Sequence, residues 1–245
     1  MTEIPTDPVK RAQEFEAAFN RIDAHLRHET GMRDKGRSVG SVIHQYQRAK
    51  PAMAQRLDML RDYADLRNAL VHERTNASEY IAYPSEETLL GILKLEQQLT
   101  APARVEQEFI DGPVQTVSPE TTIAELLDLI QQRQFTRFPV YNARNTFLGL
   151  ITSNAFAKWV ASRPGSNADV LRWSDHTVSE LLEFDQNRKA VMFVPRTELV
   201  LEVRQLFWEH SELQAIIITR SGEQNQKPLG IITPWDIARY EWDGA

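Results

Sequence analysis

Cysteine is absent from this chain of 245 residues, and its absence excludes several kinds of chemistry. Without a thiol there can be no disulfide, no thiolate metal site and no cysteine nucleophile. Long hydrophobic runs are also missing, since no stretch approaches the roughly 20 apolar residues that cross a bilayer. The N-terminal sequence MTEIPTDPVK lacks the apolar core of a signal peptide. We therefore expect a cytoplasmic protein with no membrane partner.

The sequence likewise contains no glycine-rich phosphate loop and no Ser-His-Asp signature. His25 and His28 are spaced as a possible metal pair, but no third ligand has suitable spacing, so we expect no metal site. The formal net charge of −6 argues mildly against non-specific binding of polyanions. The charge is uneven, however, because residues 21–74 contain eleven Lys and Arg against seven Asp and Glu. Any contact with a polyanion therefore belongs to the N-terminal part.

The first hundred residues have a helical pattern of apolar positions. The run that begins near Val9 places apolar side chains three and four residues apart, at Phe15, Ala18, Phe19, Ile22 and Leu26. A second helix is predicted from after Ser38 to Pro51, a third over residues 52–74, and a fourth after Ser85 as N-cap. Four helices with short links predict an all-α four-helix bundle over residues 1–103.

The remaining residues, 104–245, contain an internal repeat. Residues 116–160 are predicted to run strand, helix, strand, turn, strand, helix, and residues 191–240 repeat that order. Each copy ends in Gly, two apolar β-formers and Thr, at Gly149–Thr152 and at Gly230–Thr233. One such unit buries little surface alone, so two β-α-β-β-α units should pack as a pseudo-symmetric pair. The predicted class is thus α+β, with a first unit at about 104–165 and a second at about 170–245.

The repeat resembles a tandem pair of cystathionine-β-synthase-type (CBS) domains, also called a Bateman module. The first unit carries the resemblance in VSPETTIAELLDLI, TRFPVYN and GLITSNAF, and the second in VPRTELVLEVRQLF, AIIIT and GIITPWDI. The resemblance implies a regulatory protein that binds an adenine nucleotide (AMP, ADP, ATP or an adenosyl compound) in a cleft between the units. It implies no requirement for a metal.

The TPWD sequence of the second unit contains the best candidate for a sugar-binding residue. Thr233 is a good N-cap and Asp236 follows in the first turn, so from the residues alone both could simply cap a helix. A ribose cis-diol is best held by a carboxylate that accepts two hydrogen bonds, and the resemblance assigns that role to Asp236. The indole of Trp235 could either stack on a flat ligand or pack in the fold.

The other wall of this cleft is predicted to come from the first unit, from Phe135, Thr136 and Arg137. Arg137 would be available to a phosphate, or could be an ordinary solvated arginine. The first unit itself has Ala155 where the resemblance requires Asp, and the second unit has no counterpart of the RFP sequence. We therefore predict one competent cleft.

A second candidate site lies in the hexapeptide RNALVH of the third predicted helix. Arg67 falls in the apolar sector of that helix and must be paired, either with a carboxylate such as Glu14 or Glu16 or with a ligand. The combination of Arg67, Asn68 and His72 resembles the motif of HEPN (higher eukaryotes and prokaryotes nucleotide-binding) domains, many of which are metal-independent, dimeric endoribonucleases.

That resemblance implies that His72 is the general acid/base, that Arg67 stabilises charge on the scissile phosphate of an RNA, and that Asn68 orients them. Five residues separate Arg67 from His72, which places their side chains about 140° apart around a helix. One helix presents both poorly to one phosphate, so a ribonuclease would require a homodimer. A non-catalytic dimeric scaffold remains the third possibility, after nucleotide binding and RNA cleavage.

Overall fold

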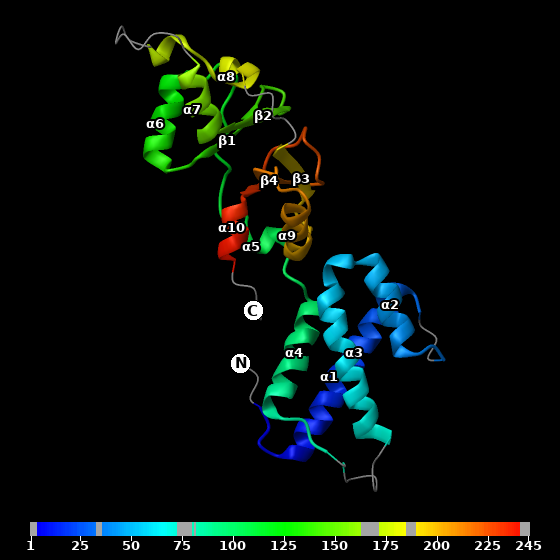
Figure 1. The fold of residues 1–245 in the computed structure, drawn as a ribbon. Coiled ribbons are helices and arrows are strands. Elements are labelled where there is room, and N and C mark those ends of the chain that lie inside the picture. Colours follow the sequence, from blue (N-terminus) through cyan, green and yellow to red (C-terminus); the bar gives the residue numbers. More distant parts are fainter. Residues whose placement is uncertain are drawn as a thin grey trace. The chain divides into compact units, whose positions relative to one another are not determined.

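The computed structural model describes residues 4–32, 36–72, 80, 82–162, 172–184 and 190–240, except for the side chain of His72. The chain divides into two units, Met1–Ala103 and Arg104–Ala245. Figure 1 follows both along the sequence. No helix in the described ranges is both long enough and apolar enough to cross a membrane.

The first unit is α-helical. Its elements are α1 (Pro8–Thr30), α2 (Val39–Ala49), the 3-10 turn η1 (Pro51–Met53), α3 (Ala54–His72) and α4 (Glu86–Thr100). Ser38 and Ser85 cap α2 and α4, which confirms both predicted helix starts. The third helix differs from the prediction at its start, since a 3-10 turn with Pro51 at its first position precedes α3, which begins at Ala54. Residues 73 and 74, its predicted end, lie outside the described residues.

The helices of the first unit share one apolar core. Helix α1 contacts α2, α3 and α4, and α3 also contacts α2 and α4. The Phe15 ring on α1 meets the Tyr63 ring on α3 edge-on, with 5.8 Å between centroids. Gly91 of α4 faces the hydroxyl of Tyr63, so the absence of a side chain at this position lets α4 approach α3.

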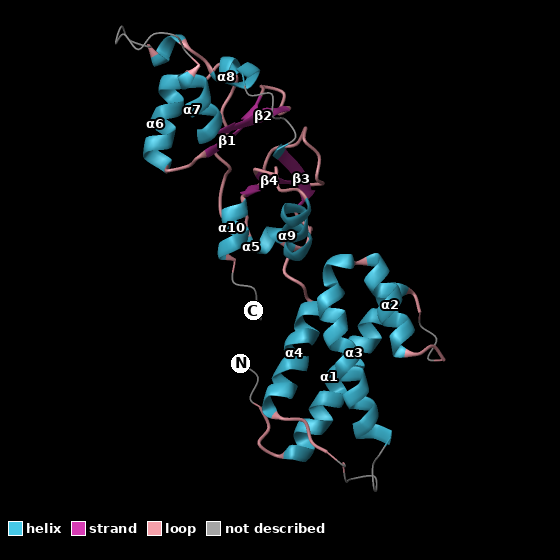
Figure 2. Ribbon diagram, in the orientation of Figure 1, coloured by secondary structure: helices cyan, strands magenta, loops and turns pink. Residues whose placement is uncertain are grey.

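The second unit contains two small sheets flanked by helices (Figure 2). The first repeat contributes α5 (Val105–Glu108), α6 (Ile123–Arg133), β1 (Arg137–Tyr141), β2 (Phe147–Thr152) and α7 (Ser153–Ala161). The second contributes α8 (Val178–Phe184), β3 (Val191–Pro195), α9 (Val200–Glu209), β4 (Ala215–Thr219), β5 (Gly230–Ile232) and α10 (Pro234–Arg239), after the 3-10 turn η2 (Trp173–Asp175). Strands β1 and β2 are antiparallel, while β4 pairs parallel with β3 and antiparallel with β5.

The first repeat departs from prediction at its first strand. In place of a strand near residue 116 there is one parallel bridge between Val117 and Val140. The N–H of Val117 donates to Pro139 O at 3.1 Å, and Tyr141 N–H donates to Val117 O at 3.0 Å. Pro119, two residues later, has no N–H to extend the ladder. The second repeat has a full strand here, because β3 pairs with β4 over five residues.

The short helices that open the two repeats are exchanged between them. The first N–H of each helix donates to a backbone carbonyl of the other repeat, in the pairs Val105 N to Glu198 O and Val178 N to Thr121 O, both at 2.9 Å. Val178 and Leu181 of α8 are accordingly buried in the core of the first repeat, together with Phe138 and Ile151. The two repeats, residues 104–165 and 170–245, follow one another along the chain. In space, however, α8 packs with the first repeat and α5 packs with the second.

Candidate functional site

Asp236 is fixed at the start of α10 by hydrogen bonds to Thr233. Its Oδ2 accepts hydrogen bonds from Thr233 N at 2.7 Å and from Thr233 Oγ1 at 2.6 Å, and Thr233 Oγ1 accepts from Asp236 N at 3.4 Å. These bonds form a capping box, so the capping role that the residues suggested is present. A carboxylate has about four lone-pair sites, and no residue in the described part of the chain donates to Oδ1. Asp236 is thus held in one orientation with accepting capacity left over.

A pocket of about 600 Å³ lies beside this carboxylate, within the second unit. Its volume falls within the roughly 300–1,000 Å³ of small-molecule sites. Its wall comes from the loop 109–115 of the first repeat, from the start of β1 and from β5 with α10. The lining residues are Phe109, Asp111, Gly112, Pro113, Val114, Gln115, Gln134, Phe135, Thr136, Arg137, Gly230, Ile231, Thr233, Trp235 and Asp236.

All six residues that the sequence placed in the competent cleft line this one pocket. They are Phe135, Thr136, Arg137, Thr233, Trp235 and Asp236. Helix α6 ends at Arg133, and its C-cap residue Gln134 has the left-handed conformation, with φ of 58°, before the chain enters β1. The pocket wall is also tied across the repeat, because Ser153 N–H donates to Thr136 O at 3.1 Å. Whether these residues hold a ligand stays a prediction.

Arg137 has hydrogen-bonding capacity that the described chain does not use. Its Nε is buried and has no hydrogen-bond partner among the described residues, and its Nη1 lies 3.4 Å from Thr136 Oγ1. A buried guanidinium N–H without a partner is unfavourable, and an anionic group in the pocket would supply the missing acceptor.

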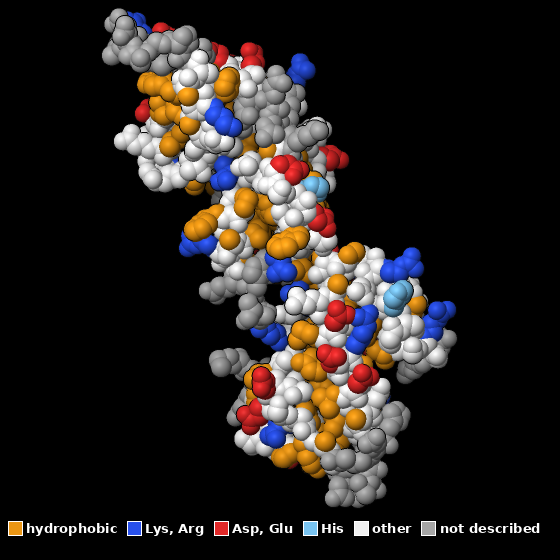
Figure 3. Space-filling model, in the orientation of Figure 1, with side chains coloured by type: hydrophobic (Ala, Val, Ile, Leu, Met, Phe, Trp, Pro, Cys, Tyr) orange, Lys and Arg blue, Asp and Glu red, His pale blue; other side chains and the backbone are white. Residues whose placement is uncertain are grey.

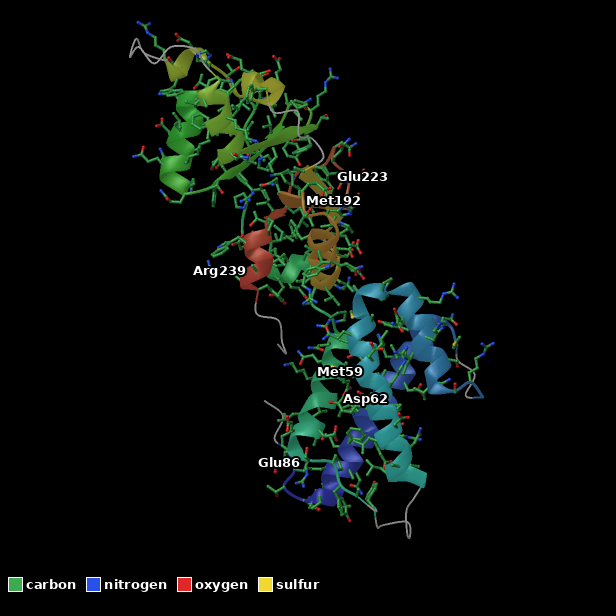
Figure 4. All side chains as sticks on the ribbon, in the orientation of Figure 1. Met59, Asp62, Glu86, Met192, Glu223 and Arg239 are labelled. Carbon is green, nitrogen blue, oxygen red and sulfur yellow. The ribbon has the colours of Figure 1, made fainter. Side chains whose placement is uncertain are left out.

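Two aromatic side chains of the pocket are exposed. Phe135 is 49% exposed and Trp235 is 66% exposed. The guanidinium of Arg239, which projects from α10 in Figure 4, lies 5.9 Å from the centre of the Trp235 ring. Exposed rings beside a pocket are suited to stacking on a flat heterocycle.

The loop 109–115 is a wall of the pocket that the sequence reasoning missed. The carbonyl oxygen of Phe109 lies 2.6 Å from the position that a Cβ on Gly230 would occupy, and the Phe109 ring lies 5.7 Å from that of Tyr240. The loop precedes the first recognisable strand and has no matching motif in the second repeat. Its one sequence signal is the turn-forming Asp-Gly-Pro of residues 111–113.

The pseudo-equivalent cleft of the other repeat is small. It encloses about 70 Å³, far below the roughly 300–1,000 Å³ of small-molecule sites, and no carboxylate is among its described lining residues, which are Leu150, Thr152, Asn154, Ala155, Lys158, Ala190 and Gln214. Thr152 caps α7 through a bond from Ala155 N at 3.1 Å, as Thr233 caps α10. Both clefts thus have a threonine that caps a helix, but the smaller cleft has Ala155 at the position of Asp236.

The helical unit places Arg67 and Asn68 side by side on α3. Arg67 Nη1 donates to Asn68 Oδ1 at 3.5 Å, while Arg67 Nε is buried without a hydrogen-bond partner in the described ranges. Glu14, one carboxylate considered for Arg67, instead pairs with Arg21 at 3.0 Å, so that expectation is wrong. The backbone of His72 belongs to α3, and its side chain lies outside the described residues.

Comparison with known families assigns the second unit. The CBS domain model matches residues 105–162 and 178–243, which together are just over half of the chain. The chain therefore belongs to the CBS domain family and contains a tandem CBS pair. A comparison with curated proteins finds no match.

Several solved structures are similar to part of the chain. The pair of protein MJ0100, in complex with 5′-methylthioadenosine and S-adenosyl-L-methionine, is 19% identical over 56% of this chain and 94% of its own, with a TM-score of 0.42. The CBS domains of a transcriptional regulator from Streptococcus pneumoniae are 18% identical over 56% and 98%, with a TM-score of 0.41. CBSX2 in complex with AMP is 16% identical over 56% and 93%, with a TM-score of 0.38.

Proposed function

We propose that the chain is a regulatory protein that binds an adenine nucleotide or adenosyl compound in the pocket between its CBS repeats. The observation that carries this proposal is the joint presence of an oriented carboxylate, an unsatisfied guanidinium and two exposed aromatic rings in one pocket of about 600 Å³. The helical unit would be the effector or dimerisation part that responds to occupancy.

Each group has a role that its chemistry supports. Asp236 would accept hydrogen bonds from the ribose 2′ and 3′ hydroxyls at the two lone-pair sites of Oδ1, since both sites of Oδ2 are used by Thr233. Arg137 would donate to a phosphate, and Phe135 or Trp235 would stack on the base. None of these roles requires a divalent metal.

Isothermal titration of the full chain with AMP, ADP, ATP and S-adenosylmethionine tests the proposal. We expect at least one of them to bind with 1:1 stoichiometry in EDTA. The Asp236→Ala variant should lose tenfold or more in affinity, about 1.4 kcal/mol. Asp128→Ala, at an exposed position of α6 outside the pocket, is the matched control. Tight binding that Asp236→Ala leaves unchanged would exclude this pocket.

A second candidate function, metal-independent RNA cleavage by a HEPN-like N-terminal domain, is supported by one observation. Arg67 has a buried Nε without a partner in the described residues and lies beside Asn68, so its guanidinium retains a donor for a phosphate oxygen. The homodimer that this function requires has a candidate surface, because Met59 of α3 and Leu90 of α4 are 45% and 53% exposed. Figure 3 shows apolar side chains gathered over these two helices.

The ribonuclease proposal is tested with the full chain and single-stranded RNA in EDTA. We expect products with a 2′,3′-cyclic phosphate that His72→Ala abolishes, while His44→Ala on α2 serves as the matched control. Light scattering should show a dimer. A dimer that cleaves no RNA would favour the non-catalytic scaffold, and a monomer would contradict both dimeric proposals.

A further inference from the structure

The pocket has few charged lining residues, and the acidic ones outnumber the basic ones. Among the lining residues that the structure describes, Asp111 and Asp236 are acidic and Arg137 is the single basic residue. Arg239 is the nearest further cation described on α10, but its guanidinium lies over the Trp235 ring and it is not part of the lining. The pocket therefore presents one cation and two anions to a ligand.

Asp236 and Arg137 together suit a ligand with a sugar and one phosphate. Asp236 is anchored to Thr233 by bonds of 2.7 and 2.6 Å to Oδ2, which leaves Oδ1 to accept from sugar hydroxyls. Arg137 has one planar guanidinium, and its buried Nε lacks an acceptor within the described chain. A planar guanidinium can donate two parallel hydrogen bonds to two oxygens of a single phosphate.

Asp111 adds a negative charge on the loop that closes the pocket. The loop is held at its start, since the Phe109 carbonyl lies against Gly230 and the Phe109 ring against Tyr240. Asp111 is exposed, so its field is screened, but each further phosphate adds negative charge that no second guanidinium of the lining can offset.

We propose that this pocket selects adenosine monophosphates over the di- and triphosphates, with Arg137 favouring the first phosphate and Asp111 opposing the others. The proposal rests on the proposed nucleotide-binding function and names the ligand class of that same site.

The test is titration of the full chain in EDTA with adenosine, AMP, ADP and ATP. We expect AMP to bind most tightly, with ATP weaker by about tenfold and adenosine weaker by a similar factor. Arg137→Gln should reduce the affinity for AMP to near that for adenosine. Asp111→Asn should narrow the ratio of AMP to ATP affinity by about threefold, and Asp111→Lys should bring ATP level with AMP or ahead of it. Asp128→Asn, which removes a carboxylate outside the pocket, is the control and should leave the ratio unchanged.

The outcomes separate this inference from the function on which it rests. Equal affinities for AMP and ATP, or a ratio that Asp111→Lys does not change, would overturn the selectivity while nucleotide binding stands. If none of these adenosine compounds binds, the proposed function fails, and the inference fails with it.

Discussion

Gly149 and Gly230 occupy equivalent positions in the two repeats, but their surroundings differ. A Cβ on Gly230 would lie 2.6 Å from the backbone oxygen of Phe109 and 2.9 Å from Ile218 Cδ1. A Cβ on Gly149 would meet only the side chain of Leu182, with Cδ2 at 2.6 Å, and a side-chain end can move aside more easily than backbone. The close approach of β5 to the loop 109–115 therefore requires glycine at position 230.

We predict that Gly230→Ala displaces the loop 109–115 and weakens adenine-nucleotide binding by fivefold or more. It should also destabilise the second unit by about 1–3 kcal/mol, the usual effect of overpacking. Gly149→Ala is the matched variant and should change affinity less than twofold. Titration calorimetry and urea unfolding measure both effects, and equal losses in the two variants would contradict the assignment of this loop to the pocket.

Tyr141 is a buried tyrosine whose hydroxyl has no hydrogen-bond partner in the described ranges. Burial raises the pKa of Tyr141 to about 12. In the unfolded chain the group loses its proton near pH 10, so between pH 10 and 12 the unfolded state holds fewer protons than the folded state. The free energy of unfolding should therefore fall as the pH rises through this range.

We predict that Tyr141→Phe reduces this alkaline loss of stability. At pH 7 the variant should be within about 1 kcal/mol of the wild type, or more stable, because the removed hydroxyl makes no bond within the described chain. Urea unfolding between pH 7 and 11 measures both effects, with the exposed Tyr83→Phe as control. An unchanged pH dependence in Tyr141→Phe would contradict the account.

At the residue scale, the sequence predicted which side chains can form hydrogen bonds better than it predicted which neighbours those side chains meet in the fold. The capping role of Thr233 and Asp236 was identifiable because a helix cap is recognised from neighbouring residues. The surroundings of Arg67 were not predictable, because helix periodicity places a side chain on a face without determining which neighbour is within reach. Glu14 lies on α1, where it forms an ion pair with Arg21.

At the element scale, the caps of the helices were predictable because they are local. Thr122 and Glu125 form a capping box at the start of α6, in which Glu125 Oε2 accepts from Thr122 N at 2.8 Å. The hydrogen bonds from Thr122 accordingly lower the pKa of Glu125. The exchange of α5 and α8 was not predictable, since it depends on bonds between residues more than fifty positions apart.

The helical unit offers a prediction at this scale, about the contact of α3 with α4. Gly91→Ala would place a methyl group on the hydroxyl of Tyr63, whose ring is fixed by Phe15. This clash should outweigh the gain of about 1 kcal/mol in helix propensity and destabilise the unit by about 1–2 kcal/mol. Gly40→Ala in α2 has no neighbour closer than 4.0 Å and should be stabilising. Thermal unfolding followed by circular dichroism compares the two variants, and a stabilising Gly91→Ala would contradict the packing.

For the whole molecule, the most informative sequence feature was the pattern of Gly, two apolar β-formers and Thr that occurs in both repeats. It indicated a CBS pair, which the family comparison confirms, and an asymmetry between the two clefts at Ala155 and Asp236. The structure has one pocket of about 600 Å³ and one of about 70 Å³ at these two positions. The loop 109–115 escaped prediction because its role arises only when the repeats pack together.

The central claim is that Asp236 holds the ribose hydroxyls of an adenine nucleotide, and a thermodynamic cycle tests it most directly. Titration of wild type and Asp236→Ala with AMP and with 2′,3′-dideoxy-AMP gives four affinities whose coupling isolates this contact. We predict that the wild type binds AMP at least tenfold more tightly than the dideoxy compound, and that Asp236→Ala binds both alike. Equal binding of the two ligands by the wild type, or full discrimination by the variant, would contradict the account.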